Sequence, residues 1–175
     1  MRRRLDTSDY NLDAVSLAPA LLGKLLCRKT GGKIIRLRIT ETEAYYGEAD
    51  TACHAHKGKT KRNAAMYLEG GHAYVYLCYG LHWLFNIVTG NEGFPEAVLI
   101  RGLEGFNGPG KLTKALSIDK SLNGENLNIS KQLWIEDSGE CPVWQASKRV
   151  GIGYASEEDQ NRLWRFVVTD SSANK

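Results

Sequence analysis

The most constraining feature of this chain is a long run in which apolar and polar residues alternate. At its end, carboxylates and a tyrosine occupy the positions where the alternation predicts apolar residues. Hydrophobic residues occupy every second position from residue 35 to residue 39 and alternate with arginine and threonine. Side chains alternate faces along a β-strand, so an unbroken strand would place the following acids and a tyrosine on the same face. This face comprises Ile35, Leu37, Ile39, Glu41, Glu43 and Tyr45. A carboxylate on a buried face costs free energy unless it is paired or functional, which makes Glu43 a candidate catalytic acid or base.

Length and composition favour a single intracellular domain. The 175 residues are enough for one compact domain with a hydrophobic core. No apolar run approaches the roughly 18 residues needed to cross a bilayer, and residues 1–6 lack the apolar segment of a secretory signal. The four cysteines are widely spaced without a CxxC pair, so free thiols are expected rather than an iron–sulfur cluster or a zinc knuckle.

The succession of apolar segments predicts an α+β fold: a single domain with a curved, mostly antiparallel β-sheet and surrounding helices. Strands adjacent in sequence and joined by short turns favour this arrangement, and no regular βαβ alternation is present. A helix capped by Ser16, with Pro19 in its first turn, is expected to carry leucines up to Leu26 on one face. Further strands are expected from residue 33 and at residues 73–79, 84–88, 97–101 and 164–168, with a helix at 111–118.

The ends of the chain and one internal segment are polar. Residues 1–13 are expected to form a polar N-terminal arm, residues 14–170 the folded domain, and residues 171–175 a polar tail. The segment 119–147 is rich in asparagine between residues 123 and 128, which predicts a surface loop.

Basic residues form two local clusters although the net charge is only +3. The first cluster lies in a glycine-containing loop, and the second follows Gly108-Pro109-Gly110. Their members are Lys57, Lys59, Lys61 and Arg62 in the first, and Lys111 and Lys114 in the second. Solvated loops explain each cluster equally well when it is taken alone. Two clusters that flank an aromatic-rich segment favour a polyanion, because phosphates are bound by such local basic patches.

Tyrosines gather near the candidate acid. Tyr74 and Tyr76 share one face of a predicted strand, Tyr79 lies at its end, and Tyr45 and Tyr46 follow Glu43. Tyrosine suits half-buried strand positions in general, which would account for two of them. The larger group indicates an aromatic slot for a planar ligand such as a nucleobase, for which stacking contributes about 1–3 kcal/mol.

Other chemistries have weaker support. Cys53-His54-Ala55-His56 suggests zinc, but adjacent residues point apart on regular structure and no second ligand pair follows at a familiar distance, so no metal is expected. No serine or cysteine nucleophile lies in a recognisable motif, and the lysines belong to basic clusters where phosphate contact or solvation is the default. No cofactor is expected.

Together these segments resemble the alkyladenine (3-methyladenine) DNA glycosylase family in order and in spacing. The likeness covers nearly the whole chain, and the combination of segments is specific although each alone is weak. The segments are Glu41–Tyr45, Asp50 with His54-Ala55, Arg62-Asn63 with Met66, Tyr74–Tyr76, Tyr79-Gly80, Asn86-Ile87, Leu99–Arg101, Gly108–Leu112, Arg149–Ile152 and Trp164–Phe166.

The resemblance implies a monofunctional enzyme of base excision repair that flips alkylated or deaminated purines from duplex DNA and hydrolyses the N-glycosidic bond. By position, Glu43 would be the general base that activates water and Arg101 its partner. Tyr45 and Tyr76 would enclose the flipped base, with His54 at its edge, and Asn86 would disfavour the amino group of guanine. Tyr79 would fill the vacated space in DNA. Lys57, Lys59, Lys61, Arg62 and Lys111 would contact the backbone.

Two other classes of function remain open at this level. A non-catalytic module that binds modified bases would need the tyrosines and the basic loops, but it would not need Glu43 or Arg101. A zinc hydrolase would require Cys53, His54 and His56 to converge. The glycosylase is expected to be a monomer associated with DNA inside the cell, without a membrane partner.

Overall fold

The computed structural model describes residues 2–169 and shows a single α+β domain, which confirms the predicted fold class. Ten strands form one sheet system in which the continuous path runs β1-β8-β2-β3-β6-β5-β4, and every pairing described is antiparallel. The strands are β1 (Arg3–Arg4), β2 (Leu25–Thr30), β3 (Lys33–Tyr46), β4 (Ala73–Cys78), β5 (His82–Val88), β6 (Glu96–Leu103), β7 (Phe106–Asn107), β8 (Leu133–Asp137), β9 (Trp144–Ser147) and β10 (Arg165–Val168). The helices are α1 (Ala14–Ala20), α2 (Pro109–Ala115) and α3 (Glu157–Asn161), with 3-10 turns η1 (Ala64–Tyr67) and η2 (Lys120–Leu122).

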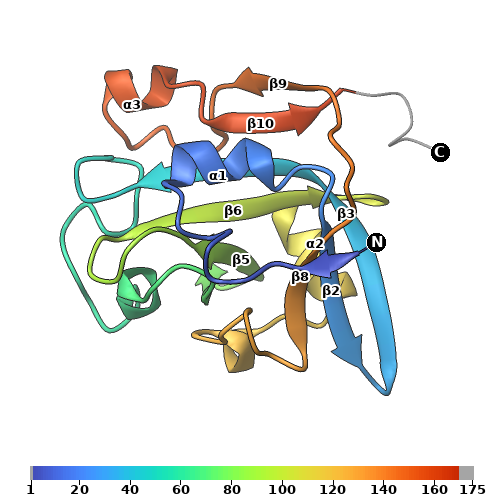
Figure 1. Cartoon of the computed structure of the whole chain (residues 1–175). Coiled ribbons are helices and arrows are strands. Elements are labelled where there is room, and N and C mark those ends of the chain that lie inside the picture. Colours follow the sequence, from blue (N-terminus) through green and yellow to red (C-terminus); the bar gives the residue numbers. More distant parts are fainter. Residues whose placement is uncertain (1, 170–175) are drawn as a thin grey trace.

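Strand β3 organises the sheet because it has different neighbours along its length. Its first half pairs with β2 through the hairpin at Gly31-Gly32, and its second half, from Ile39, pairs with β6. β10 pairs with the other edge of β3 at residues 41–43. The segment that the sequence singled out therefore lies between two strands, in the middle of the sheet (Figure 1).

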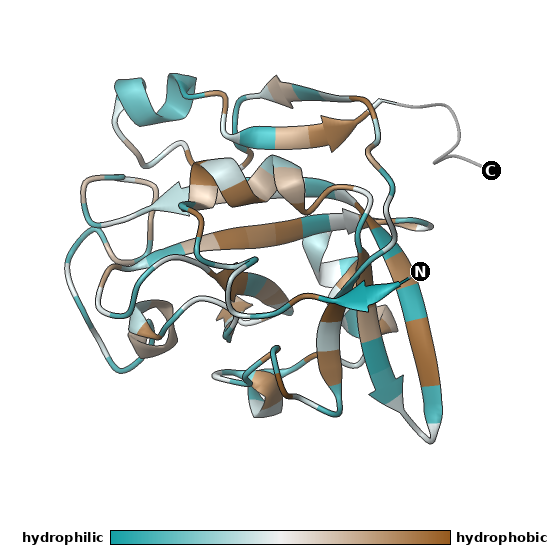
Figure 2. Cartoon of the chain, in the orientation of Figure 1, coloured by the Kyte–Doolittle hydropathy of each residue, from teal (hydrophilic) through white to brown (hydrophobic). Residues whose placement is uncertain are grey.

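The apolar residues divide into a main core and a smaller cluster. In the main core, α1 packs against β3 and β6, and fully buried side chains come from both strands, such as Ile39 and Ile100. The smaller cluster joins Met66 and Tyr67 of η1 to Tyr74 of β4. Figure 2 shows this patterning, with β6 mainly hydrophobic and α3 mainly hydrophilic. No helix among residues 2–169 is long and apolar enough to cross a membrane.

The helix predicted from Ser16 is shorter than expected. Asp13, not Ser16, is the N-cap, and its side chain accepts a hydrogen bond from the Ser16 amide. The helix ends at Ala20, and Gly23, at φ +83°, turns the chain into β2. Leu26 therefore lies in a strand rather than on a helix face. The run of leucines fits both patterns, and pairing of β2 with both β3 and β8 decides the outcome.

The prediction of a surface loop at residues 119–147 is also wrong for most of this segment. Leu122, Leu127 and Leu133 are buried in the main core, and β8 pairs with β1 and β2. Asn123 accepts a hydrogen bond from the amide of Val75 in β4. The side chains of Asn123 and Asn126 thus serve as partners for backbone amides, which composition alone does not distinguish from solvated turns.

The amino-terminal residues expected to form an arm lie against the domain. Arg3 and Arg4 pair with Asp137 and Glu136 of β8, and Leu5 and Tyr10 are buried in the main core. These two buried side chains, the β1–β8 pairing and the hydrogen bonds from Arg4 to the Leu127 and Ser130 carbonyls hold this polar stretch against the domain. The tail expected at residues 171–175 lies outside the described residues.

The remaining predicted elements agree with the structure to within a few residues, whereas β7, β9 and α3 were not predicted. The predicted strands at 73–79, 84–88, 97–101 and 164–168 correspond to β4, β5, β6 and β10, and the predicted helix at 111–118 to α2. β10 lies beside β3, so the end of the described chain covers the segment around Glu43.

Glu96 gives the fold a pH dependence that can be measured. Its carboxylate accepts a hydrogen bond from the Ala14 amide at 2.7 Å, and burial raises its pKa to about 7. The hydrogen bond from Ala14 opposes this rise, but burial dominates and favours the protonated carboxyl in the folded state. The contribution of Glu96 to stability is therefore complete below the ordinary glutamate value of 4.5 and is lost as pH rises through about 7. Between pH 5 and pH 8, the wild-type protein should lose about 2 kcal/mol of its free energy of unfolding through ionisation of Glu96. Urea unfolding at the two pH values should show that Glu96→Gln lacks this loss. Glu92 is an exposed acid on the neighbouring loop, and Glu92→Gln should keep the wild-type dependence of the free energy of unfolding on pH. The same dependence in Glu96→Gln would contradict the assignment.

Candidate active site

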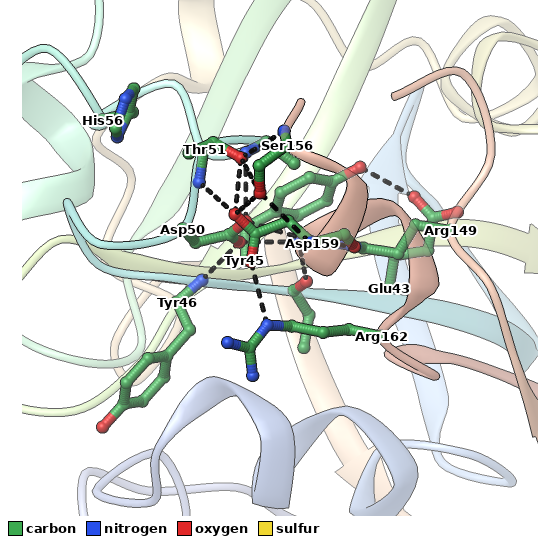
Figure 3. Close-up of polar contacts among 12 residues, drawn as sticks. Glu43, Tyr45, Tyr46, Asp50, Thr51, His56, Arg149, Ser156, Asp159 and Arg162 are labelled. Atoms are coloured by element: carbon green, nitrogen blue, oxygen red, sulfur yellow. Dashed lines mark hydrogen bonds and ion pairs between the residues drawn. The ribbon is translucent and has the colours of Figure 1, made fainter. Parts of the chain in front are cut away.

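The carboxylate of Glu43 is completely buried, and both of its oxygens accept hydrogen bonds. The Tyr45 hydroxyl donates to Oε2 at 2.8 Å, a contact drawn in Figure 3, and the Val150 amide donates to Oε1 at 2.8 Å. The alternation of β3 brings Tyr45 back to the same side two residues later. A loop from the far end of the chain supplies the second donor. The predicted buried acid with an adjacent ring is therefore present.

Arg101 of β6 is brought to the same place. Its Nε lies 3.6 Å from Oε1 of Glu43, within ion-pair range but beyond hydrogen-bonding distance. The register explains this closeness, since Leu99 and Ile100 of β6 are opposite Glu43 and Thr42. The positive charge therefore faces Glu43 without being hydrogen-bonded to it.

Burial raises the pKa of Glu43, while the charge of Arg101 and the hydrogen bonds from Val150 and Tyr45 oppose the rise. The net direction is upward, so the carboxylate is a stronger base than an exposed glutamate. Burial also raises the pKa of Tyr45 well above its ordinary value, and the charge of Glu43 adds to this rise. The tyrosine therefore stays protonated as a donor at neutral pH.

An aromatic pocket lies beside Glu43. Its cavity is small, about 30 Å³, the space of a single water molecule. The lining residues are Tyr45, Ala52, His54, Met66, Tyr74, Tyr76, Asn86 and Tyr154. All four predicted pocket residues, Tyr45, His54, Tyr76 and Asn86, are among them. A purine could enter only if some of these side chains moved.

Contacts within the pocket fix two of its polar side chains. Nδ1 of His54 lies 3.0 Å from the Tyr74 hydroxyl, and the His54 ring meets the Tyr76 ring edge-on at 4.4 Å between centroids. Desolvation and, second, the charge of Arg62 lower the pKa of His54, so the neutral imidazole is favoured at physiological pH. Nδ2 of Asn86 donates to the Tyr74 carbonyl, which orients its amide in the wall.

A larger cleft of about 1340 Å³ adjoins the pocket and shares Tyr45, His54, Tyr76 and Tyr154 with it. Arg101 and Val150 also line the cleft, so the residues that surround the buried carboxylate face this space. The hairpin between β4 and β5 forms another part of its wall. At the tip of this hairpin Tyr79 is 88% exposed and Leu81 is 74% exposed.

The predicted basic residues divide between the cleft and the surrounding surface. Arg62, Lys111 and Lys114 line the cleft, and the guanidinium of Arg62 lies 5.9 Å from the centre of the Tyr76 ring. Lys57, Lys59 and Lys61 are exposed, and the ammonium of Lys59 lies over the Tyr67 ring. The cleft thus has cationic side chains from two separate segments, as the two clusters in the sequence suggested.

The cysteine and histidines that suggested zinc do not converge. Cys53 is buried in the smaller apolar cluster, whereas His56 is bound to the Glu48 carbonyl at the surface and stands apart in Figure 3. Within the described range no three potential metal ligands of the histidine, cysteine and carboxylate type form a group.

The sequence did not identify a buried ion pair that supports the site. Arg149 donates to both oxygens of Asp50 at 2.6 and 2.9 Å, and both side chains are almost fully buried. The guanidinium stacks between the rings of Tyr45 and Trp164, at 4.9 and 5.0 Å from their centres. Because Arg149 stacks on Tyr45 and directly precedes Val150, the Asp50–Arg149 pair supports both donors to Glu43.

Tyr154 was also missed. It lines both the pocket and the cleft, its hydroxyl donates to the Ala52 carbonyl, and the residue as a whole is 67% exposed. Asp50 and Arg149–Ile152 belong to matching segments of the sequence, but no sequence pattern indicated that they would meet. Their 99-residue separation becomes a contact only through the pairing of β3 with β10.

Comparisons with known proteins find relatives that match nearly the whole chain. The family model described as methylpurine-DNA glycosylase (MPG) matches residues 8–172. A Borrelia garinii protein is 46% identical, covering 95% of this chain and 97% of its own length. A Natranaerobius thermophilus protein is 42% identical over 96% of both chains, and a Methanocella arvoryzae protein is 43% identical over 93% of this chain and 90% of its own. All three carry the name "Putative 3-methyladenine DNA glycosylase".

The chain belongs to the methylpurine-DNA glycosylase family, which confirms the resemblance found in the sequence. It is a DNA glycosylase, a hydrolase of DNA repair that processes alkylated bases and binds DNA as its substrate.

Proposed function

We propose that this glycosylase flips alkylated or deaminated purines of the 3-methyladenine, hypoxanthine and ethenoadenine class out of duplex DNA and hydrolyses their N-glycosidic bonds with water activated by Glu43. The observation that carries the proposal is the buried Glu43 carboxylate, with its raised pKa, behind an aromatic pocket. A base inside the DNA stack is out of reach of such a carboxylate, so flipping is required.

The proposed reaction needs only water and the residues around Glu43. The bond between C1′ of the sugar and the purine nitrogen breaks, and the base leaves with the electron pair. Positive charge develops on the sugar, and the carboxylate stabilises it. Water adds to C1′ and gives a proton to Glu43. The product in the DNA is an abasic site. Arg101 faces the same carboxylate and the cleft, where it would help to orient the water.

The pocket side chains would read the flipped base. Tyr45 and Tyr76 would enclose it, with His54 at its edge. Asn86, whose amide is held by the Tyr74 carbonyl, would disfavour the exocyclic amino group of guanine. Tyr79 at the exposed hairpin tip would fill the gap in the duplex. Cationic and poorly paired bases flip and leave more easily, which adds to selectivity.

The test is base release from defined duplexes. Wild-type protein should release 3-methyladenine, hypoxanthine and ethenoadenine, leaving alkali-labile abasic sites, and should leave a matched undamaged duplex intact. We propose that it acts as a monomer on chromosomal DNA inside the cell. Tight binding to the damaged duplexes, with no base released from any of them, would instead identify a binding module.

The basic side chains beside the cleft should control affinity rather than lesion choice. Changing Lys61 and Arg62 together to glutamine should weaken binding to damaged and undamaged duplexes alike. The slope of log K against log salt should also fall by about 1 for each lost phosphate contact. Fluorescence anisotropy at several salt concentrations measures both effects. Lys29→Gln with Lys33→Gln, exposed on the β2–β3 hairpin, is the matched control; an unchanged slope in the first variant would show that its loop does not contact phosphate.

A further inference from the structure

Glu41 is a second carboxylate on β3, two residues before Glu43, and it is held by two arginines. Its Oε1 accepts hydrogen bonds from Nε of Arg165 at 2.6 Å and from Nε of Arg101 at 3.0 Å. The pairing of β3 with β6 is irregular on both sides of Glu41. This irregularity breaks the alternation predicted from the sequence and gives Glu41 surroundings different from those of Glu43.

Local packing leaves room for this arrangement. Gly102 of β6 is opposite Glu41, and a methyl group on Gly102 would lie 3.0 Å from the Cβ of Glu41 and 3.0 Å from Oγ1 of Thr40. That spacing is tighter than ordinary van der Waals contact. The absence of a side chain at residue 102 thus allows Glu41 to lie beside Arg101.

Arg101 therefore faces two carboxylates but is hydrogen-bonded to only one through Nε. The distance from Nε is 3.0 Å to Glu41 and 3.6 Å to Glu43. Hydrogen bonds weaken steeply over this interval, so Glu41 holds the guanidinium more strongly. Arg165 at the same oxygen compensates the charge of Glu41.

We propose that Glu41, paired with Arg165, is a positioning residue that holds Arg101 at the cleft and prevents it from closing onto Glu43. This inference rests on the proposed function, in which Glu43 accepts a proton from water. A direct hydrogen bond from Arg101 would occupy the lone pair that this transfer needs and would make the carboxylate a weaker base. Glu41 thus keeps the cation near Glu43 while leaving the carboxylate basic.

The charged and titratable groups that face Glu43 come from several elements. On β3 they are Glu41 and Tyr45, and on β6 the neighbour is Arg101. The others are Tyr76 of β4, Arg149 of the loop before Val150, and Arg165, which is opposite Glu43 in the register of β10. Glu41 is hydrogen-bonded to Arg101, and Arg165 is hydrogen-bonded to Glu41. Neither is hydrogen-bonded to Glu43 in the described part of the chain, so variants at these two positions separate the effect.

Two variants should shift the acidic side of the pH–rate profile for base release in opposite directions. Glu41→Gln frees Arg101 to pair with Glu43 and removes a like charge, so the pKa of Glu43 should fall and the acid limb of single-turnover base release should move to lower pH. The rate on its neutral plateau should fall about tenfold, within the coupling range of residues in one ion-pair network. Arg165→Gln leaves Glu41 uncompensated, so the limb should move to higher pH.

Carbon-13 NMR of labelled glutamate carboxyls gives a measurement that does not need DNA, with Glu43→Gln used to assign the Glu43 signal. The signal should titrate at lower pH in Glu41→Gln and at higher pH in Arg165→Gln. Glu136→Gln, which alters a comparable strand pair with Arg36 away from the cleft, should match wild type in both measurements. An unmoved titration of Glu43 in both variants would overturn the inference, even if their activity fell uniformly through damage to the fold. Failure of wild-type protein to release any base would contradict the proposed function separately.

Discussion

The Glu43→Gln variant should release damaged bases about 10²–10⁴-fold more slowly than wild type, the range that a positioned general base contributes. Glutamine can still accept one hydrogen bond from Tyr45 or Val150, so the surroundings should persist. It cannot take a proton from water or carry a negative charge beneath the sugar. Single-turnover assays with excess enzyme isolate this step from product release, and anisotropy should show binding to the damaged duplex within about twofold of wild type.

An exposed acid provides the matched control for this loss. Glu48 accepts a hydrogen bond from Tyr67 on the surface loop, and Glu48→Gln should keep the wild-type rate. Because the pKa of Glu43 is raised, wild-type activity should begin to fall on the acid side at a higher pH than for an exposed glutamate. Base release at the wild-type rate by Glu43→Gln would refute the assigned mechanism.

Replacing Asp50 with alanine should destabilise the protein by about 3–5 kcal/mol, because it leaves the buried guanidinium of Arg149 without its counter-charge. Asp50 also accepts hydrogen bonds from the amides of Tyr46 and Ala52, which would lose their partner. Urea unfolding monitored by tryptophan fluorescence measures this cost, since Trp164 stacks on Arg149.

The control is an acid that pairs with arginine at the surface. Glu158 contacts Arg162 at 2.6 Å, but its side chain is 79% exposed, and Glu158→Ala should change stability by no more than about 1 kcal/mol. Similar losses in the two variants would show that burial of the Asp50–Arg149 pair does not matter. Where Asp50→Ala remains folded, its rate of base release should also fall, because Tyr45 and the Val150 amide lose their support.

Local patterns predicted the parts of this structure that depend on local periodicity. Alternation along β3 placed Glu43 and Tyr45 on one side, and the hydrogen bond between them confirms it. The unbroken face predicted from Ile35 to Tyr45 was wrong, because the pairing of β3 with β6 shifts register on both sides of Glu41. The sequence of β3 alone does not contain its pairing with β6.

Errors elsewhere arose where tertiary pairing selected between two local possibilities. Leu25 and Leu26 suit a helix or a strand, and β8 on the other side of β2 selects the strand. The ion pair of Asp50 with Arg149 joins residues far apart in the chain, and aspartate and arginine are residue types that are mostly exposed. The pocket residues Tyr45, His54, Tyr76 and Asn86 were found because a family pattern placed them, while their assigned roles stay predictions.

The position of β10 beside Glu43 has a consequence for synthesis of the protein. Glu43 is made 107 residues before the Val150 amide that binds it, and β10, which pairs beside it, is made later still. A ribosome-bound chain that stops before residue 148 would carry the acid without its donor, its stacking arginine or its covering strand. Activity should therefore arise only after β10 (Arg165–Val168) has been made, so that chains stopped earlier cannot remove bases from DNA.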